Sequence, residues 1–206
     1  MRAILTFATV AFAAAAFAQD ANDITRPTED IFQVRYASNL NKGDSVINIT
    51  NTGSDIPGDN ICVNVYTFDP SEEMVSCCSC LVTPNALVSL SVQGDLISNT
   101  LSPSTPTAVV IKLISVRPAD EVTCNPGSLT TTDTLAPGMR AWGTTLHALP
   151  STPVTYGVTE SGFLPGGLSA AEAQHLFSFC GFIQANGSGF GICKSCRAGG
   201  LGGAKQ

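Results

Sequence analysis

Ser45-Val46-Ile47-Asn48-Ile49-Thr50-Asn51 is the stretch of this chain that decides its fold class. Ile47 and Ile49 fall on one face of an extended segment and Asn48 and Thr50 on the other, because side chains of a β-strand alternate between two faces. Turn-forming residues flank the stretch on both sides. The pattern therefore predicts a strand that buries one face in a sheet.

Short segments of the same kind follow along the chain, separated by turns rich in Gly, Pro, Asn and Asp. The segment 108–116 is strongly apolar and β-branched, which predicts a central strand. The succession of hairpins without interleaved helices argues against a parallel α/β sheet. It predicts a mainly β fold, an immunoglobulin-like β-sandwich. The predicted strands are residues 31–36, 45–51, 60–68, 74–82, 86–92, 108–116, 139–149 and 154–159.

One C-terminal helix is predicted after the strands. Ser169 and Glu172 are the two ends of a capping box, in which each residue satisfies an open backbone donor of the other. Asn186-Gly187 offers a left-handed stop at the far end. An apolar stripe at helical spacing indicates a face packed against the sheet, and its members are Ala173, Leu176, Cys180 and Ile183.

The N-terminal stretch has the three parts of a secretory signal peptide. Arg2 precedes an apolar run that ends in Ala16-Phe17-Ala18, which predicts cleavage after Ala18. A membrane anchor is the alternative, but the run is shorter than the roughly 20 apolar residues that a spanning helix needs. We therefore expect residues 1–18 to be removed and the mature chain to be secreted or periplasmic.

Composition restricts the partners. Charged residues make up 13% of the chain, against about 25% in average globular proteins. The formal net charge of −6 becomes −7 when Arg2 leaves with the signal peptide. An acidic chain without a Lys/Arg cluster repels phosphate backbones, so nucleic acid is not an expected partner. Stable membrane insertion after signal cleavage is not expected either, because no second apolar stretch approaches spanning length.

The expected organisation is one domain with polar ends. Residues 19–30 are a flexible lead-in, residues 31–196 form a single sandwich domain, and residues 197–206 are a Gly-rich tail. The Thr-rich stretch 119–137 is the alternative boundary of a subdomain. The mature length suits one sizeable core better than two.

An even number of cysteines in an exported chain predicts a disulfide framework. Cys77 and Cys78 are adjacent in a predicted strand, so they should point to opposite faces and have different partners, whereas Cys78 and Cys80 should share a face. Pairing within two groups, before and after residue 100, is one hypothesis for the connectivity, and Cys180 would then tie the helix to a stapled, Gly-rich C-terminal loop. The eight candidates are Cys62, Cys77, Cys78, Cys80, Cys124, Cys180, Cys193 and Cys196.

Other functional motifs are incomplete in this sequence. Cys193-Lys194-Ser195-Cys196 has the spacing of a redox C-x-x-C, but no βαβ pattern surrounds it. A thiolate metal site lacks two regular C-x-x-C knuckles. His147 and His175 stand in no metal-ligand spacing, and Gly187-Ser188-Gly189 is not placed as a nucleophile elbow. We therefore assign no catalytic, cofactor-binding or metal-ligating residue and expect no cofactor.

Ser76-Cys77-Cys78-Ser79-Cys80 and the closing stretch from Cys180 to Cys196 resemble a group of secreted, cysteine-containing bacterial proteins for which no activity is established. The resemblance runs through most of the mature chain and implies no functional residue. Separately, the segment 46–53 resembles an inner strand of immunoglobulin-like modules on bacterial surfaces.

The sequence thus favours a secreted, non-catalytic domain that binds a partner protein or surface ligand, or contributes to an extracellular assembly. A β-sandwich leaves end loops and edge strands free for recognition. A secreted hydrolase with an unrecognised site is one alternative. A thiol redox or metal-handling protein that uses Cys193 and Cys196 is the other.

Overall fold

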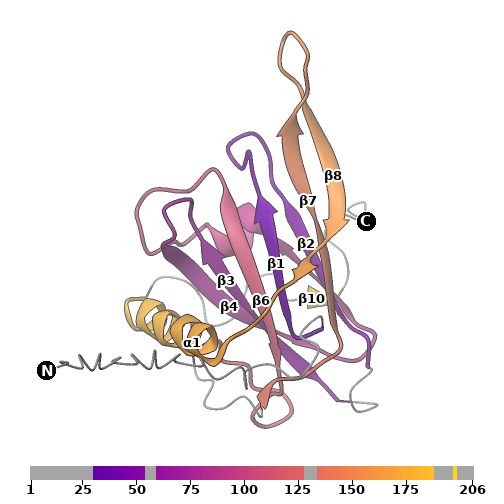
Figure 1. Cartoon of the computed structure of the whole chain (residues 1–206), viewed down its shortest axis with the longest axis vertical. Coiled ribbons are helices and arrows are strands. Elements are labelled where there is room, and N and C mark those ends of the chain that lie inside the picture. The colour runs from indigo at the N-terminus through magenta and orange to yellow at the C-terminus, as the bar shows by residue number, and fades with distance from the viewer. Residues whose placement is uncertain (1–29, 54–58, 128–133, 188–196, 199–206) are drawn as a thin grey trace, which may run out of the picture.

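The computed structural model describes residues 30–53, 59–127 and 134–187, together with the backbone of 197–198 (Figure 1). The predicted signal peptide and Cys193 and Cys196 lie outside the described residues. The division of the chain into lead-in, single domain and tail stays a prediction.

The fold is mainly β, with two five-stranded antiparallel sheets and one helix, as a β-sandwich requires. The first sheet has the strand order β4 (Met74–Val82), β3 (Ile61–Phe68), β6 (Val109–Val116), β1 (Phe32–Ala37), β9 (Leu164–Pro165). The second sheet has the order β10 (Arg197–Ala198), β5 (Leu87–Ser91), β2 (Val46–Asn51), β7 (Met139–Ala148), β8 (Tyr156–Gly162).

The main core lies between the two sheets. Ile47 and Ile49 of β2 are buried there and alternate with half-buried neighbours, so the predicted one-sided strand is confirmed. Val63 and Val65 of β3 meet them from the first sheet. Strand β6, the most apolar segment predicted, lies in the middle of the first sheet between β3 and β1.

A second core lies between the first sheet and the helix α1 (Ala170–Ala185), which Figure 1 shows crossing that sheet. The predicted N-cap is confirmed, because the Ser169 hydroxyl accepts a hydrogen bond from Glu172 N–H at 3.1 Å. Gly187 ends the helix with a φ of 71°, as the left-handed stop predicts. The predicted stripe is buried, and Phe177 belongs to it as well. In the described residues, no helix combines the length and the apolarity that a membrane crossing needs.

The chain closes one side of the sandwich by passing from β8 in the second sheet to β9 in the first. Phe163, between the two strands, is buried and donates its backbone N–H to Ala141 of β7 at 2.9 Å. Gly166 N–H then donates to Phe32 of β1 at 3.1 Å. The sequence did not predict β9 or β10, since two-residue strands leave no periodic signal.

Strand β5 ends earlier than predicted, in a π-helical turn at Val92–Leu96. The Ser91 hydroxyl accepts from Gly94 N–H at 2.7 Å, and the buried Asp95 carboxylate accepts from Ser91 N–H at 2.7 Å. Local side-chain hydrogen bonds of this kind offer the backbone an alternative to the sheet ladder. They explain why the alternating pattern of 86–92 does not continue as a strand.

Candidate functional site

The cysteines form the first group of predicted site residues. Cys62 bonds Cys124 and Cys77 bonds Cys180, with sequence separations of 62 and 103 residues. Both bonds join the early cysteines to the late ones, so the hypothesis of pairing within two groups is wrong. Cys180 ties α1 to β4 rather than to the C-terminal loop. The connectivity depends on how the chain folds back across the first sheet. The spacing of cysteines along the sequence carries no information about that path.

The two faces of β4 carry different cysteines, as the alternation predicted. Cys77 faces α1 in the second core, and Cys78 and Cys80 face the opposite sheet in the main core. Cys78 and Cys80 are also disulfide-bonded. Every cysteine among the described residues is therefore oxidised, which fits a compartment outside the reducing cytoplasm.

The two histidines and the acidic turn around Asp69, Glu72 and Glu73 lie on different elements. His147 is exposed on β7, 3.3 Å from the Thr159 hydroxyl. His175 is exposed on α1, where its ring lies tilted against Phe179 with ring centroids 4.3 Å apart. Asp69 orders its own turn by accepting from two backbone N–H groups. In the part of the chain that the structure describes, no three His, Cys, Asp or Glu side chains gather as a metal-ligating group.

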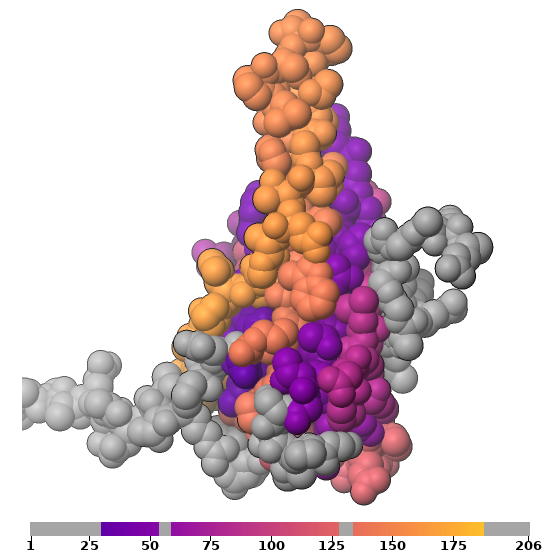
Figure 2. Space-filling model, turned by 90° about the vertical axis from the view of Figure 1, so that its right-hand side faces the viewer, coloured from indigo at the N-terminus to yellow at the C-terminus, as the bar shows by residue number. Residues whose placement is uncertain are grey.

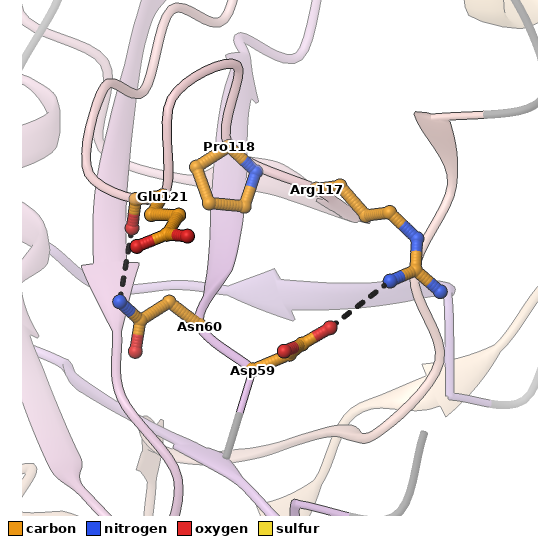
Figure 3. A pocket seen from close by; sticks show the side chains of 5 residues that line it. All are labelled: Asp59, Asn60, Arg117, Pro118 and Glu121. Atoms are coloured by element: carbon orange, nitrogen blue, oxygen red, sulfur yellow. Dashed lines mark hydrogen bonds and ion pairs between the residues drawn. The ribbon is translucent and has the colours of Figure 1, made fainter. Parts of the chain in front are cut away.

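A polar hollow of about 330 Å³ opens at one end of the first sheet (Figure 3). Arg117 pairs with Asp59 at 3.3 Å across it, and Asn60 donates its side-chain amide to the backbone oxygen of Glu121 at 2.9 Å. Both charged partners are well exposed, so the ion pair contributes at most about 1 kcal/mol. The hollow offers charge and amide groups, but its described lining brings no nucleophile beside a base.

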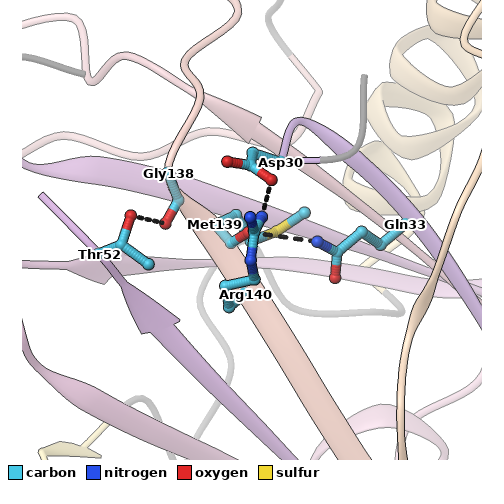
Figure 4. Close-up of polar contacts among 6 residues, drawn as sticks. All are labelled: Asp30, Gln33, Thr52, Gly138, Met139 and Arg140. Carbon is cyan, nitrogen blue, oxygen red and sulfur yellow. Dashed lines mark hydrogen bonds and ion pairs between the residues drawn. The ribbon is translucent and has the colours of Figure 1, made fainter. Parts of the chain in front are cut away.

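Polar contacts at the same end join the start of β7 to both sheets (Figure 4). Arg140 forms an ion pair with Asp30, and the side-chain amide of Gln33 donates to Met139 O at 3.2 Å. Thr52 of the second sheet donates its hydroxyl to Gly138 O at 3.0 Å. These contacts fix where β7 begins, and hence the direction in which it runs.

The β7–β8 hairpin extends past the other end of the sandwich, where Figures 1 and 2 show it rising beyond the other strands. Ser38 Oγ and Asn39 Nδ2 both donate to Leu146 O at 2.9 Å, which holds β7 against the turn after β1. Beyond that point β7 and β8 continue as a pair, with Leu149 N–H donating to Thr155 O at 2.8 Å.

Arg35 of β1 holds the base of this hairpin. Its side chain is only 8% exposed, and it donates to Ser161 Oγ at 2.9 Å and Thr145 Oγ1 at 3.0 Å. Burial lowers the pKa of Arg35, and the carboxylate of Glu160 raises it in part. An arginine nonetheless stays charged in a protein, so Arg35 ties the first sheet to both strands of the hairpin.

The tip of the hairpin, residues 149–155, is ordered by Ser151. Its hydroxyl accepts from Thr155 N–H at 3.0 Å, and it donates to Pro153 O at the same distance. Leu149 and Val154 are 40% and 60% exposed on this tip. An ordered loop that exposes apolar side chains on a rigid scaffold is a typical recognition element.

A second exposed apolar surface lies on α1, where Phe179 and Phe182 are 47% and 57% exposed. A second hollow, of about 310 Å³, lies beside the π-helical turn, and Gln93, Ile97 and Thr107 belong to its lining. Of these surfaces the hairpin extends furthest from the sheets (Figure 1).

Sequence reasoning missed the hairpin as a candidate site. Residues 141–159 contain no Asp, Glu, Lys or Arg, and this run of 19 uncharged residues ends at Glu160. An uncharged, Pro-punctuated run that spans two predicted strands and the turn between them was the available signal. Its meaning depends on how far the strands extend past their neighbours, which only the structure shows.

Comparison with known proteins gives no independent guide to the site, because no protein-family model, no curated protein and no solved structure matches this chain.

Proposed function

We propose that this chain is exported and acts outside the cytoplasm as a non-catalytic binding domain, with the hairpin tip as its recognition element. The observation that carries the proposal is the ordered tip with its exposed Leu149 and Val154, set on a hairpin that Arg35 anchors to the opposite sheet. A preorganised apolar loop loses little conformational entropy on binding, so a modest contact area is enough to bind a partner. The partner is a protein or surface ligand with an apolar recess.

Export is supported by two independent features. The signal-peptide pattern of residues 1–18 predicts translocation, and the oxidised cysteines of the described residues need an oxidising compartment. The mature protein should therefore begin at Gln19. A mass spectrum of the protein from its native host tests this, and an unprocessed, reduced chain would contradict it.

We propose further that the four central strands follow immunoglobulin-like order. In that fold strands B and E are neighbours in one sheet, and strands C and F in the other. β2 pairs with β5, and β3 pairs with β6, which supports this assignment. The outer strands differ, because the first strand, β1, lies beside β6 and the seventh, β7, beside β2. An experimental structure that separates either central pair would contradict the assignment.

We also propose a stapled C-terminal loop, in which Cys193 and Cys196 bond Cys78 and Cys80. The position of β10 supports this pairing. β10, which begins one residue after Cys196, pairs with β5 at the edge of the second sheet. β4 is the edge of the first sheet, and Cys78 and Cys80 are buried between the sheets. Mass spectrometry of unreduced peptides should recover these links. A Cys193–Cys196 bond would instead favour the redox alternative.

The binding function is tested by photo-crosslinking in the native host. A photoreactive residue replaces Thr152 at the tip or, as the matched control, Val122, which is 61% exposed in the loop after β6. The tip should give a discrete adduct with another protein, and Leu149→Ser should remove that adduct. Equal adducts from both positions, or none from the tip, would contradict the proposal.

A further inference from the structure

Strand β8 is the edge of the second sheet in the described part of the chain, and its outward backbone groups can be assigned. Leu149 N–H donates to Thr155 O, and Phe163 N–H donates to Ala141 O. Hydrogen-bonded pairs alternate in an antiparallel ladder, so the odd-numbered residues of β8 bond β7. The even-numbered residues therefore direct their N–H and C=O groups away from the sheet, and they are Tyr156, Val158, Glu160 and Gly162.

This edge lacks most of the features that usually prevent strand addition, and Glu160 is the one charged side chain of β8. Natural edge strands are protected by Lys, Pro or a bulge. β8 contains neither Lys nor Pro, and its register with β7 runs without a shift from Tyr156 to Gly162. Five of its seven residues are exposed, and Val158 is 64% exposed. Figure 2 shows the hairpin strands at the surface of the face turned to the viewer.

The edge is also complementary to itself. A two-fold axis through Thr159, the middle residue of β8, pairs all seven residues with those of a second antiparallel copy. This register places outward-directed Val158 opposite Glu160 of the second copy, so hydrogen bonds form and the two carboxylates do not face each other. An axis through Glu160 would set like charges directly opposite and shorten the overlap.

The apolar residues that flank the strand are symmetric about the same axis. Val154 precedes Thr159 by five residues and Leu164 follows it by five, and they are 60% and 72% exposed. The axis brings Val154 of one copy to the end of the strand where Leu164 of the other lies. The uncharged run 141–159 keeps most of the hairpin free of the repulsion expected between two acidic chains.

We propose that two copies of this chain pair through β8, edge to edge and antiparallel, to form one continuous sheet with its two-fold axis at Thr159. The inference rests on the edge strand and not on the binding function of the tip. Antiparallel pairing directs the two hairpin tips in opposite directions, each toward the base of the other copy's hairpin.

Sedimentation of the mature protein measures the assembly. The native protein should show twice the chain mass, and Val158→Pro should return it to the mass of one chain, because proline removes an outward N–H while the bonds to β7 remain. Val158→Thr, which keeps the N–H, should stay dimeric. Far-UV circular dichroism checks that the proline variant is folded. A native protein that sediments as a monomer at high concentration, or a dimeric, folded Val158→Pro variant, would overturn the proposal.

Cysteine crosslinking tests the register independently. Thr159 lies opposite its own copy in a non-hydrogen-bonded pair, where the short Cα separation suits a disulfide. Thr159→Cys should therefore form a covalent dimer on oxidation, and Val158→Cys alone should not. A mixture of Val158→Cys and Glu160→Cys should crosslink again. Crosslinking of Val158→Cys to itself, or none from Thr159→Cys, would refute this register.

Discussion

Removal of the Cys77–Cys180 bond should destabilise the protein and release α1 in particular. In the chain-entropy description, a crosslink that closes a loop of about 100 residues contributes about 4.7 kcal/mol. The Cys62–Cys124 bond overlaps this loop and shortens its effective length to about 70 residues. The proposed bonds of Cys78 and Cys80 to Cys193 and Cys196 would shorten it further, to about 15 residues, which lowers the figure to about 3 kcal/mol. We expect Cys77→Ala/Cys180→Ala to lose about 3 kcal/mol of unfolding free energy.

Guanidinium denaturation followed by circular dichroism measures this loss. With a denaturant slope of about 4 kcal/mol per molar, the unfolding midpoint should fall by about 0.75 M. Hydrogen exchange should accelerate most in α1, because the bond joins that helix to β4. Cys62→Ala/Cys124→Ala is the matched control, since its loop of 62 residues predicts a loss of about 4 kcal/mol, at least as large, without release of the helix. A midpoint shift below about 0.3 M, or unchanged exchange in α1, would refute the reasoning.

Two further predictions concern the hairpin base and the loop after β6. Arg35→Met should cost about 1 to 2 kcal/mol in denaturant unfolding, because the part-buried acceptors on β7 and β8 lose their charged donor; a variant as stable as the native protein would show that Arg35 does not hold the hairpin. The pKa of Asp120 lies below its usual value because the side chain and backbone of Thr123 donate to its carboxylate. Because this pKa is lowered, the ionised Asp120 carboxylate stabilises the loop at pH values above its ordinary pKa of 3.8. That stabilisation is lost as the pH falls through the folded-state pKa. The protection of the Thr123 amide, measured relative to its intrinsic exchange rate at each pH, should therefore fall on acidification below that range. Asp120→Asn should abolish this loss of protection in an NMR exchange experiment.

The sequence predicted the elements whose formation depends on residues close together in the chain. Strand β2 follows from alternation, and α1 follows from a cap, a stripe and a stop within one stretch of chain. The same holds for the opposite faces of Cys77 and Cys78, which depend only on the pleat of one strand.

Long-range arrangements escaped prediction. The partner of Cys180 depends on where α1 lies on the first sheet, and the role of Arg35 depends on the approach of β1 to the hairpin. The candidate site missed by the sequence is of this kind. Leu149 and Val154 look like ordinary strand-end residues until the strands that carry them extend past their neighbours.

The overlap of the two described disulfides has a mechanical consequence. Residues 62 and 180 are separated by about 118 residues of chain, which would span about 390 Å if pulled straight. The bond from Cys77 to Cys180 leaves a covalent path of only about 15 residues between them, or about 50 Å. Under tension between its two ends, an unfolded molecule would therefore lengthen mainly through the segments outside this span, and most of the sandwich would stay short enough to refold in place.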